Sequence, residues 1–412
     1  MRWNLALIGF CMYTIATVTY VAPIGQAGMI VALVGLLFGK DRVRLPLPLI
    51  FFGAYYLLGV ATSPMAFYQV MVKQEIEDMA RVGLIFLVGI NVLHDRTRLR
   101  FYLFLYLAAF GLYPVRGALF NQFIYNASEL GRIAWNQTFE NPNDLAAFLL
   151  VPMGLSIGVF YTEKHRYVRY AALLGVSLIA LIVFMTQSRG AILALGVFGL
   201  FVLARAKKRL RMLPVIAVMG LVIALFAPDS VWTRLRNLKT ATGSGELKKA
   251  NDLGSAEQRF EIWKVAVSIW KEKPILGVGL GAYAIEHWRR ARSNTETFNP
   301  TARGGRDAHS TYLRVLAELG VIGFVFFMGI FVSMYIYASR ARKIIMRSDP
   351  DGERQIFFAQ AAFLGYGVAA IFGSWAHIPF TYMNVAILYC ICHVAIQKHR
   401  ERQAVGARPR FS

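Results

Sequence analysis

Apolar segments of about twenty residues recur along the whole chain, and short polar or charged segments separate them. A helix needs about 20 apolar residues to cross a hydrocarbon core of roughly 30 Å. The pattern therefore predicts an all-α polytopic membrane protein with about twelve transmembrane helices, forming a single transmembrane domain over residues 1–412. The expected spans are Leu5 to Tyr20, Ile24 to Phe38, Leu47 to Ala61, Met79 to Leu93, Phe101 to Val115, Leu145 to Tyr161, Val168 to Phe184, Ser188 to Ala204, Leu213 to Phe226, Thr311 to Ala338, Phe357 to Ser374 and Pro379 to Ile396.

The distribution of Lys and Arg predicts the orientation of these spans. More than half of the basic residues fall at the ends and loops that share a side with Met1, and few fall in the short loops of the other side. Short cytoplasmic loops carry this excess, so we expect both termini in the cytoplasm. The segment 229–309, between spans nine and ten, is expected to form one long outer loop, which its length exempts from the rule.

Composition supports a membrane protein, and a membrane topology explains the high net positive charge. Hydrophobic residues make up 57% of the 412 positions, more than a soluble core of this length requires. Because the net charge of +22 comes largely from the orienting clusters, it is no argument for nucleic-acid binding. The three cysteines, Cys11, Cys390 and Cys392, all fall inside expected spans, where we expect them to pack as small apolar groups.

The second half of the long loop predicts an ordered segment. Ser255 and Gln258 fit a capping box, which would open a helix over about 256–272. Aromatic and apolar residues at helical spacing then form one stripe, which predicts a helix lying on the membrane surface: Phe260, Trp263, Val267 and Trp270. After Pro274, the glycine run Gly277–Gly281 is interpreted as a close-packing turn. A nucleotide-binding loop is the alternative, but no strand precedes the run.

The polar break Met185–Gly190 is the first candidate site. The apolar segment after it is too short to cross a membrane unaided, which draws Ser188 and Arg189 toward the outer headgroup level. An arginine at that depth is a functional hypothesis by default. A snorkelling side chain at a helix end is the alternative.

A second candidate site precedes the tenth span. Arg303, Arg306 and Asp307 come just before His309, and a helix starting here would place Tyr312 on the face of His309. Histidine is the usual positioned base near neutral pH, although a lone histidine is often structural. In the same span, Arg314 and Glu318 are spaced to pair with each other.

Three further positions complete the candidates. Arg259, near the start of the expected surface helix, suits an anionic headgroup, or is simply a surface arginine. In the turn Phe139–Asp144, Asn143 or Asp144 can cap the next helix, and Asn143 is also a candidate for substrate contact. His377 lies in a short outer loop. No cluster at metal-ligand spacing is visible on the outer side, so we expect chemistry without a metal or another cofactor.

Several of these segments, in this order, resemble the O-antigen ligase and polymerase superfamily of bacterial envelope glycosyltransferases. The resemblance covers about residues 141–323 and is carried by Asn141–Ala146, Ser188–Gly190, Arg259 with Trp263, Pro274–Gly279, His309–Leu313 and Glu318–Gly323. Ser310 departs from the family, where Asn often follows the histidine. The length and the segment 139–146 are similar to the branch of putative O-glycosylation ligases associated with exosortase systems.

The resemblance implies a GT-C-like fold in the bacterial inner membrane with a site facing the periplasm. It also implies transfer of a glycan from undecaprenyl diphosphate to a hydroxyl acceptor. In the family, the arginines matching Arg189 and Arg259 are implicated in holding the diphosphate, and the histidine matching His309 in activating the acceptor. Fixed guanidinium groups suit a diphosphate leaving group, and a base near the acceptor suits the chemistry.

Three acceptors stay open at this stage, and so does one unrelated function. Lipid A core oligosaccharide, a protein hydroxyl and the growing glycan correspond to a ligase, a protein O-oligosaccharyltransferase and a polymerase. A transporter or flippase for a lipid-linked sugar is the alternative outside the enzymes. Transporters tend to carry charges near the bilayer midplane, whereas the candidate charges here collect at the outer interface.

Overall fold

The computed structural model describes residues 4–39, 43–127, 131–205, 251–293 and 304–406. These residues fold into helices and contain no β-strand. The helices are α1 (Leu5–Thr19), α2 (Ala22–Leu37), α3 (Leu47–Thr62), α4 (Gln69–Val92), α5 (Arg96–Phe110), α6 (Arg116–Phe123), α7 (Pro142–Thr162), α8 (Arg166–Met185), α9 (Arg189–Arg205), α12 (Asn251–Glu272), α13 (Tyr283–Ser293), α14 (Thr311–Ile345), α15 (Pro350–Ala369) and α16 (Pro379–Gly406).

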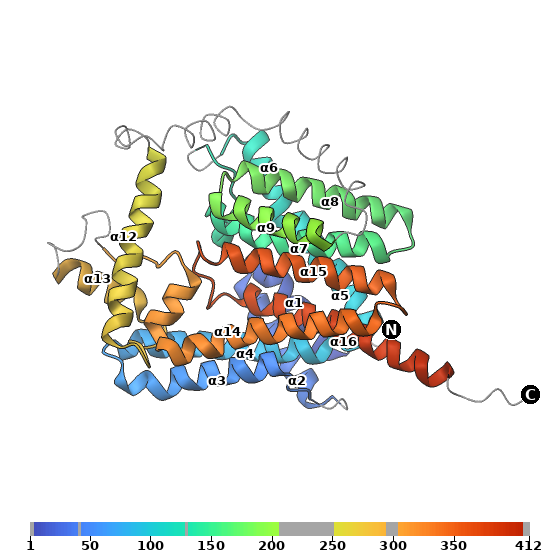
Figure 1. Ribbon diagram of the computed structural model, residues 1–412, viewed down its shortest axis with the longest axis horizontal. Coiled ribbons are helices and arrows are strands. Elements are labelled where there is room, and N and C mark those ends of the chain that lie inside the picture. The colour runs from blue at the N-terminus through green and yellow to red at the C-terminus, as the bar shows by residue number, and fades with distance from the viewer. Residues whose placement is uncertain (1–3, 40–42, 128–130, 206–250, 294–303, 407–412) are drawn as a thin grey trace, which may run out of the picture.

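Most of the long helices run side by side along the longest axis of the molecule (Figure 1). Helices α7 and α16 are the most enclosed, while α3, α8 and α14 expose apolar side chains on their outer faces, as lipid-facing helices do. A π-helical turn at Gly111–Val115, which contains Pro114, joins α5 to α6 without ending the helical path. Helix α1 begins and α16 ends at the end of the bundle opposite α12 (Figure 1).

An all-α membrane protein is confirmed, while the span count stays a prediction. Within the described ranges, six helices are long and apolar enough to cross a membrane, and α1 and α2 are shorter apolar helices. The expected span Leu213 to Phe226 lies outside the described residues. Helix α15 ends at Ala369 and not at Ser374, because Ala370 and Gly373 turn their carbonyl groups toward Thr311 instead of continuing the helix.

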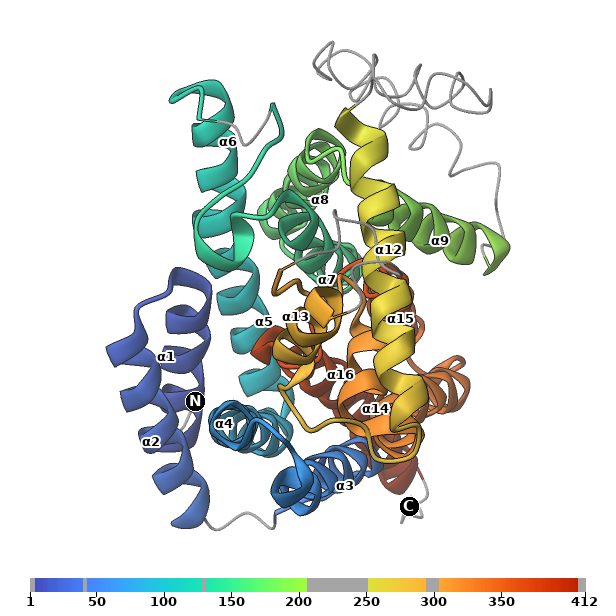
Figure 2. The same ribbon diagram turned by 90° about the vertical axis from the view of Figure 1, so that its left-hand side faces the viewer.

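Helix α12 crosses the ends of the other helices (Figures 1 and 2). It begins at Asn251, earlier than expected, so Ser255 lies inside the helix and the predicted capping box is wrong. The side chains that pack against the protein are not those of the expected aromatic stripe. The side chains buried against the protein are Ile262, Val265, Ala266 and Ile269, whereas Phe260 is exposed and Trp263, Val267 and Trp270 are half-buried.

The reason for this difference is a second apolar face on the same helix. At 100° per residue, Ile262 and Ile269 lie well over a quarter turn from Phe260 and Val267. The protein covers the aliphatic face, because α12 packs on α14 and α13. The aromatic face is only partly covered, with Phe260 exposed and Trp263 in contact with Ala308 and Phe372, and its location on a membrane surface stays a prediction.

Helix α14 breaks at Gly320, and the glycine run packs into the break. Gly320 has a φ of 62° and a ψ of −163°, which only glycine adopts readily. The helical bonds lost there are replaced: Val278 N–H donates to Ala317 O at 3.0 Å, and Gly279 N–H to Glu318 O at 2.8 Å. In return, Val321 N–H donates to Pro274 O at 2.8 Å.

The interpretation of the glycine run as a close-packing turn is therefore confirmed. A Cβ atom on Gly277 would lie 2.3 Å from the carbonyl group of Glu318, and one on Gly320 would lie 2.3 Å from that of Ile275. The two backbones can approach this closely only because neither residue has a side chain. The turn fixes the first part of α14, and with it the segment that carries His309.

Candidate active site

Four segments that are distant in the sequence meet at the end of the bundle that α12 crosses. They are the turn between α8 and α9, the start of α7, the segment before α14 and the connection between α15 and α16. The last two are joined directly: Thr311 N–H donates to Ala370 O at 2.9 Å, and the Thr311 hydroxyl donates to Gly373 O at 2.6 Å. The same hydroxyl accepts from Trp375 N–H at 2.9 Å. Most of the sequence-predicted residues lie on these segments.

In the α8–α9 turn, Ser188 and Arg189 have separate roles. Ser188 is buried, and its hydroxyl accepts a hydrogen bond from Ala191 N–H at 3.3 Å, as a helix N-cap does. Arg189 is exposed in the first turn of α9. A cation at a helix N-terminus adds to the positive end of the helix dipole, which favours a bound anion. Ser188 thus builds the turn, and Arg189 faces out of it.

Arg259 comes close to Arg189 from α12. Burial lowers the pKa of Arg259, Asp144 raises it, and the positive charge of Arg189 lowers it further. Among the residues that the structure describes, neither arginine forms an ion pair. Asp144 is the carboxylate that acts electrostatically on Arg259. Guanidinium groups have planar forks that match phosphate oxygens, so this pair of arginines is a candidate anion-binding site.

His309 lies just outside α14, half-buried and close to the arginines. Ser310 is the N-cap of α14 and accepts from Leu313 N–H at 3.5 Å, so the helix begins after His309. Burial lowers the pKa of His309, Asp307 raises it, and Arg259 and Arg306 lower it. The imidazole is therefore kept neutral near pH 7, as a base that accepts a proton requires.

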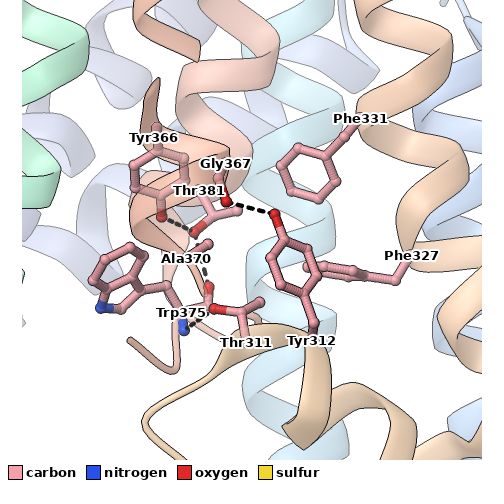
Figure 3. Close-up of a pocket in the computed structure, with 9 residues that line it drawn as sticks. All are labelled: Thr311, Tyr312, Phe327, Phe331, Tyr366, Gly367, Ala370, Trp375 and Thr381. Carbon is pink, nitrogen blue, oxygen red and sulfur yellow. Dashed lines mark hydrogen bonds between the residues drawn. The ribbon is translucent and has the colours of Figure 1, made fainter. Parts of the chain in front are cut away.

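The predicted shared face of His309 and Tyr312 is wrong, because His309 is not helical and has a φ of 44°. The Tyr312 hydroxyl instead donates to Gly367 O at 2.6 Å (Figure 3). It lines a cavity of about 10 Å³ together with Phe327, Phe331 and Tyr366, among other residues. Arg303, a further sequence-predicted residue, lies outside the described residues.

The start of α7 is capped by Asn141, and not by Asn143 or Asp144 as predicted. Asn141 accepts from Asn143 N–H at 2.9 Å. This frees the other two side chains for contacts across the site. Arg132 donates to Asn143 Oδ1 at 3.0 Å and also to Thr186 O at 2.8 Å, which ties α7 to the α8–α9 turn.

Asp144 belongs to the site although the sequence indicated only a cap. Trp375 Nε1–H donates to Asp144 Oδ1 at 2.9 Å, and Asp144 has Arg259 and Asp307 as electrostatic neighbours. Trp375 is buried and stacks on Tyr366 with 5.4 Å between ring centroids. The aromatic layer between α7 and the α15–α16 connection thus holds a carboxylate beside the arginine pair.

His377 is held by two carboxylates, one of which the sequence analysis missed. Its Nδ1 lies 2.7 Å from Glu75 Oε1, and its Nε2 lies 3.1 Å from Glu318 Oε2. Arg314 pairs with Glu318 at 3.0 Å, as predicted from their spacing. Glu75 lies before the expected span Met79 to Leu93, but α4 begins at Gln69, so Glu75 is in the helix.

The sequence did contain a signal for Glu75. It lies three residues after Val72 and four before Met79, so it shares the face of α4 that those two wholly buried side chains define. A carboxylate on the buried face of a helix needs a partner, and His377 supplies it.

Residues 146–328 match the family model of the O-antigen ligase. A curated protein that resembles the chain is the exopolysaccharide production protein ExoQ of Rhizobium meliloti (strain 1021), 26% identical over 106 residues. Those residues cover 26% of this chain and 24% of ExoQ, so the match spans about a quarter of the relative's length. The resemblance to the O-antigen ligase superfamily is confirmed. The comparisons support a ligase-type or polymerase-type enzyme of envelope glycans.

Proposed function

We propose that the chain is a glycosyltransferase of the O-antigen ligase type. It transfers a glycan from undecaprenyl diphosphate to a hydroxyl acceptor, lipid A core oligosaccharide or a related surface acceptor, on the periplasmic face of the bacterial inner membrane. The observation that carries the proposal is the grouping of three side chains from separate segments: Arg259 has Arg189 and His309 as electrostatic neighbours.

The chemistry follows from the charges of this arrangement. The acceptor oxygen attacks the anomeric carbon of the donor sugar, and the bond from that carbon to the diphosphate oxygen breaks. Negative charge develops on the diphosphate, where Arg189 and Arg259 stabilise it by bidentate hydrogen bonds. The hydroxyl proton passes to His309, which is about half-exposed and close to Arg259. Attack from the face opposite the leaving group inverts the anomeric centre.

Asp144 has a defined place in this scheme. It lies near Arg259, but its carboxylate accepts a hydrogen bond from Trp375. Asp144 therefore does not form a close ion pair with Arg259. Arg259 is thus available for the donor diphosphate. Fixed cations can take the place of a divalent metal at the leaving group, so we propose that the reaction does not require a metal.

Glycan growth is the second candidate reaction, because the curated relative is named for exopolysaccharide production. A polymerase uses the same donor chemistry and differs only in the acceptor, which is then another lipid-linked glycan. Supplying each acceptor class separately distinguishes the ligase, the protein O-oligosaccharyltransferase and the polymerase.

The test follows the leaving group. Purified protein is given undecaprenyl diphosphate glycan and one acceptor in the presence of EDTA, and release of undecaprenyl diphosphate is measured. We expect release that requires the acceptor and is lost in His309→Ala, with donor binding retained. If no acceptor supports release and the protein instead moves the lipid across liposomes, the proposed transfer is wrong and a flippase is favoured.

A further inference from the structure

Four ionisable side chains from three parts of the chain form a largely buried cluster that Asp307 connects to His309, and we name this cluster the brace. Glu75 comes from α4, Arg314 and Glu318 come from the first part of α14, and His377 comes from the α15–α16 connection. The shortest contact is His377 Nδ1 to Glu75 Oε1, at 2.7 Å. Arg314 Nη2 lies 3.9 Å from Glu75 Oε2 and pairs with Glu318 at 3.0 Å, which closes the cluster.

Stability alone is a weak reason for the brace. Glu318 is wholly buried and His377 is 7% exposed, so both were removed from water on folding. Burying charges is costly, and apolar side chains of similar volume often fill such a space as well or better. The backbone of Gly281 hydrogen-bonds to Glu318, which adds a further fixed contact. The brace therefore fixes geometry more than it adds stability.

The brace ends at Asp307, which also contacts His309. Arg314 Nη1 lies 3.9 Å from Asp307 Oδ1. The other carboxylate oxygen, Asp307 Oδ2, accepts from His309 N–H at 3.4 Å and lies 3.8 Å from His309 Nδ1. Asp307 thus lies between the half-buried guanidinium of Arg314 on one side and the candidate base on the other.

The backbone of His309 needs such support. Its φ of 44° is in the left-handed region, which a non-glycine residue adopts at a cost and keeps only where its surroundings hold it. The contact from Asp307 to the His309 amide is one such hold. Trp263 Nε1–H donates to Ala308 O at 3.1 Å and fixes the preceding residue.

We propose that Asp307 is a positioning residue, which holds His309 in place and balances its charge during transfer, and that the brace fixes Asp307 through Arg314. The inference rests on the proposed transfer reaction. When the acceptor hydroxyl gives its proton to His309 Nε2, the ring becomes an imidazolium whose Nδ1 faces Asp307. Asp307 keeps its charge throughout, and the electron pair of the broken bond stays on the diphosphate.

The charges that face His309 make the proposal specific. On its own segment these are Asp307 and Arg306, and from α12 it is Arg259. Without the carboxylate, His309 faces only cations, and its protonated form is disfavoured. The base then holds the hydroxyl proton less well, while the diphosphate site is unchanged.

The experiment uses the purified full chain and compares Asp307→Asn, Glu75→Gln and His377→Gln with wild type. Glu353→Gln is the matched control, because Glu353 pairs with Arg342 at 2.6 Å at the opposite end of α15 and is 18% exposed, against 23% for Glu75. For all three site variants we expect kcat to fall about 10-fold to 100-fold, with an unchanged donor KM. The control should keep the wild-type kcat.

A second readout does not depend on activity. Diethyl pyrocarbonate modifies neutral imidazole, so peptide mass spectrometry across a pH series reports when His309 becomes protonated. In Asp307→Asn we expect the midpoint of His309 labelling to move to lower pH, and in Glu353→Gln to stay. Wild-type kcat in all three variants together with an unmoved midpoint would overturn the proposal. If the wild type releases no undecaprenyl diphosphate with any acceptor, the proposed function fails, and the labelling midpoint still decides the role of Asp307.

Discussion

Replacing Gly277 by Ala should destabilise the protein strongly, because the glycine run replaces hydrogen bonds that α14 lacks. Gly277 has a φ of 70°, and a Cβ atom there would lie 2.3 Å from the carbonyl carbon and oxygen of Glu318. Ordinary contact begins at 3.4 Å, so the turn must recede by about 1 Å. The hydrogen bonds from Val278 and Gly279 to α14, at 3.0 and 2.8 Å, then stretch beyond useful length.

The magnitude follows from these two effects. The left-handed backbone costs an alanine about 1–2 kcal/mol. Each carbonyl group left without a partner inside the protein costs about 1–3 kcal/mol. With two such carbonyl groups, on Ala317 and Glu318, the expected loss in the free energy of unfolding is about 3–8 kcal/mol, which is large for a single methyl group.

The assay is thermal unfolding of the purified protein in one detergent, followed by tryptophan fluorescence. Gly53→Ala is the matched control, since Gly53 lies in α3 with nothing within 4 Å of its added Cβ. Alanine in a helix interior is about 1 kcal/mol better than glycine, so the control should melt at or above the wild-type temperature. A Gly277→Ala protein that melts with or above Gly53→Ala would refute the reasoning.

The other predictions concern the site. Arg189→Lys should lose transfer nearly as fully as Arg189→Ala, because lysine cannot make the bidentate contact; kcat measured with saturating donor checks this. Trp375→Phe removes the hydrogen bond to Asp144, so the carboxylate is free to pair with Arg259 and compete with the donor diphosphate, which raises the donor KM. The free energy of unfolding should fall by about 1–3 kcal/mol. The value of kcat/KM should fall as the pH drops through the pKa of His309, because the protonated imidazole cannot accept a proton. Burial lowers this pKa, so a pH profile of kcat/KM should show activity retained to a lower pH than a histidine of ordinary pKa allows.

A pH effect of opposite sign should come from His377. Burial and Arg314 lower its pKa, but Glu318 and Glu75 outweigh them, so its pKa is raised in the folded protein. A group with a raised folded pKa contributes stability that is complete below its unfolded pKa and is lost as pH rises through the folded pKa. Unfolding measured on the alkaline side should therefore become easier, and His377→Gln should remove this dependence.

Local patterns in the sequence predicted the helices and the charges of the site. Apolar length located most of the helices, and the polar residues around Arg189, Arg259 and His309 were selected as candidates because charge is rare beside an apolar span. The glycine run was interpreted correctly because no strand precedes it, as a nucleotide-binding loop would require. These signals are all local, and a sequence displays them directly.

Contacts between distant segments could not be derived in the same way. The break at Gly320 is stabilised by contacts with the distant residues Pro274 and Gly277. Within the long span itself, the only signal for a break is the glycine at position 320. The hydrogen bond from Trp375 to Asp144 joins residues 231 positions apart. In α12, two apolar faces competed, and the tertiary structure covered the aliphatic one, which helical periodicity alone does not decide.

The brace also has a consequence for exchanging parts between relatives. The segment that matches the O-antigen ligase model, residues 146–328, contains Arg189, Arg259 and His309, whereas Glu75 and His377 lie on either side of it. A chimaera that transplants only this segment would carry the three residues proposed to react and leave two residues of the brace behind. Its success would depend on what the host protein places at those two positions, so the smallest transferable unit of this enzyme extends from α4 to the α15–α16 connection.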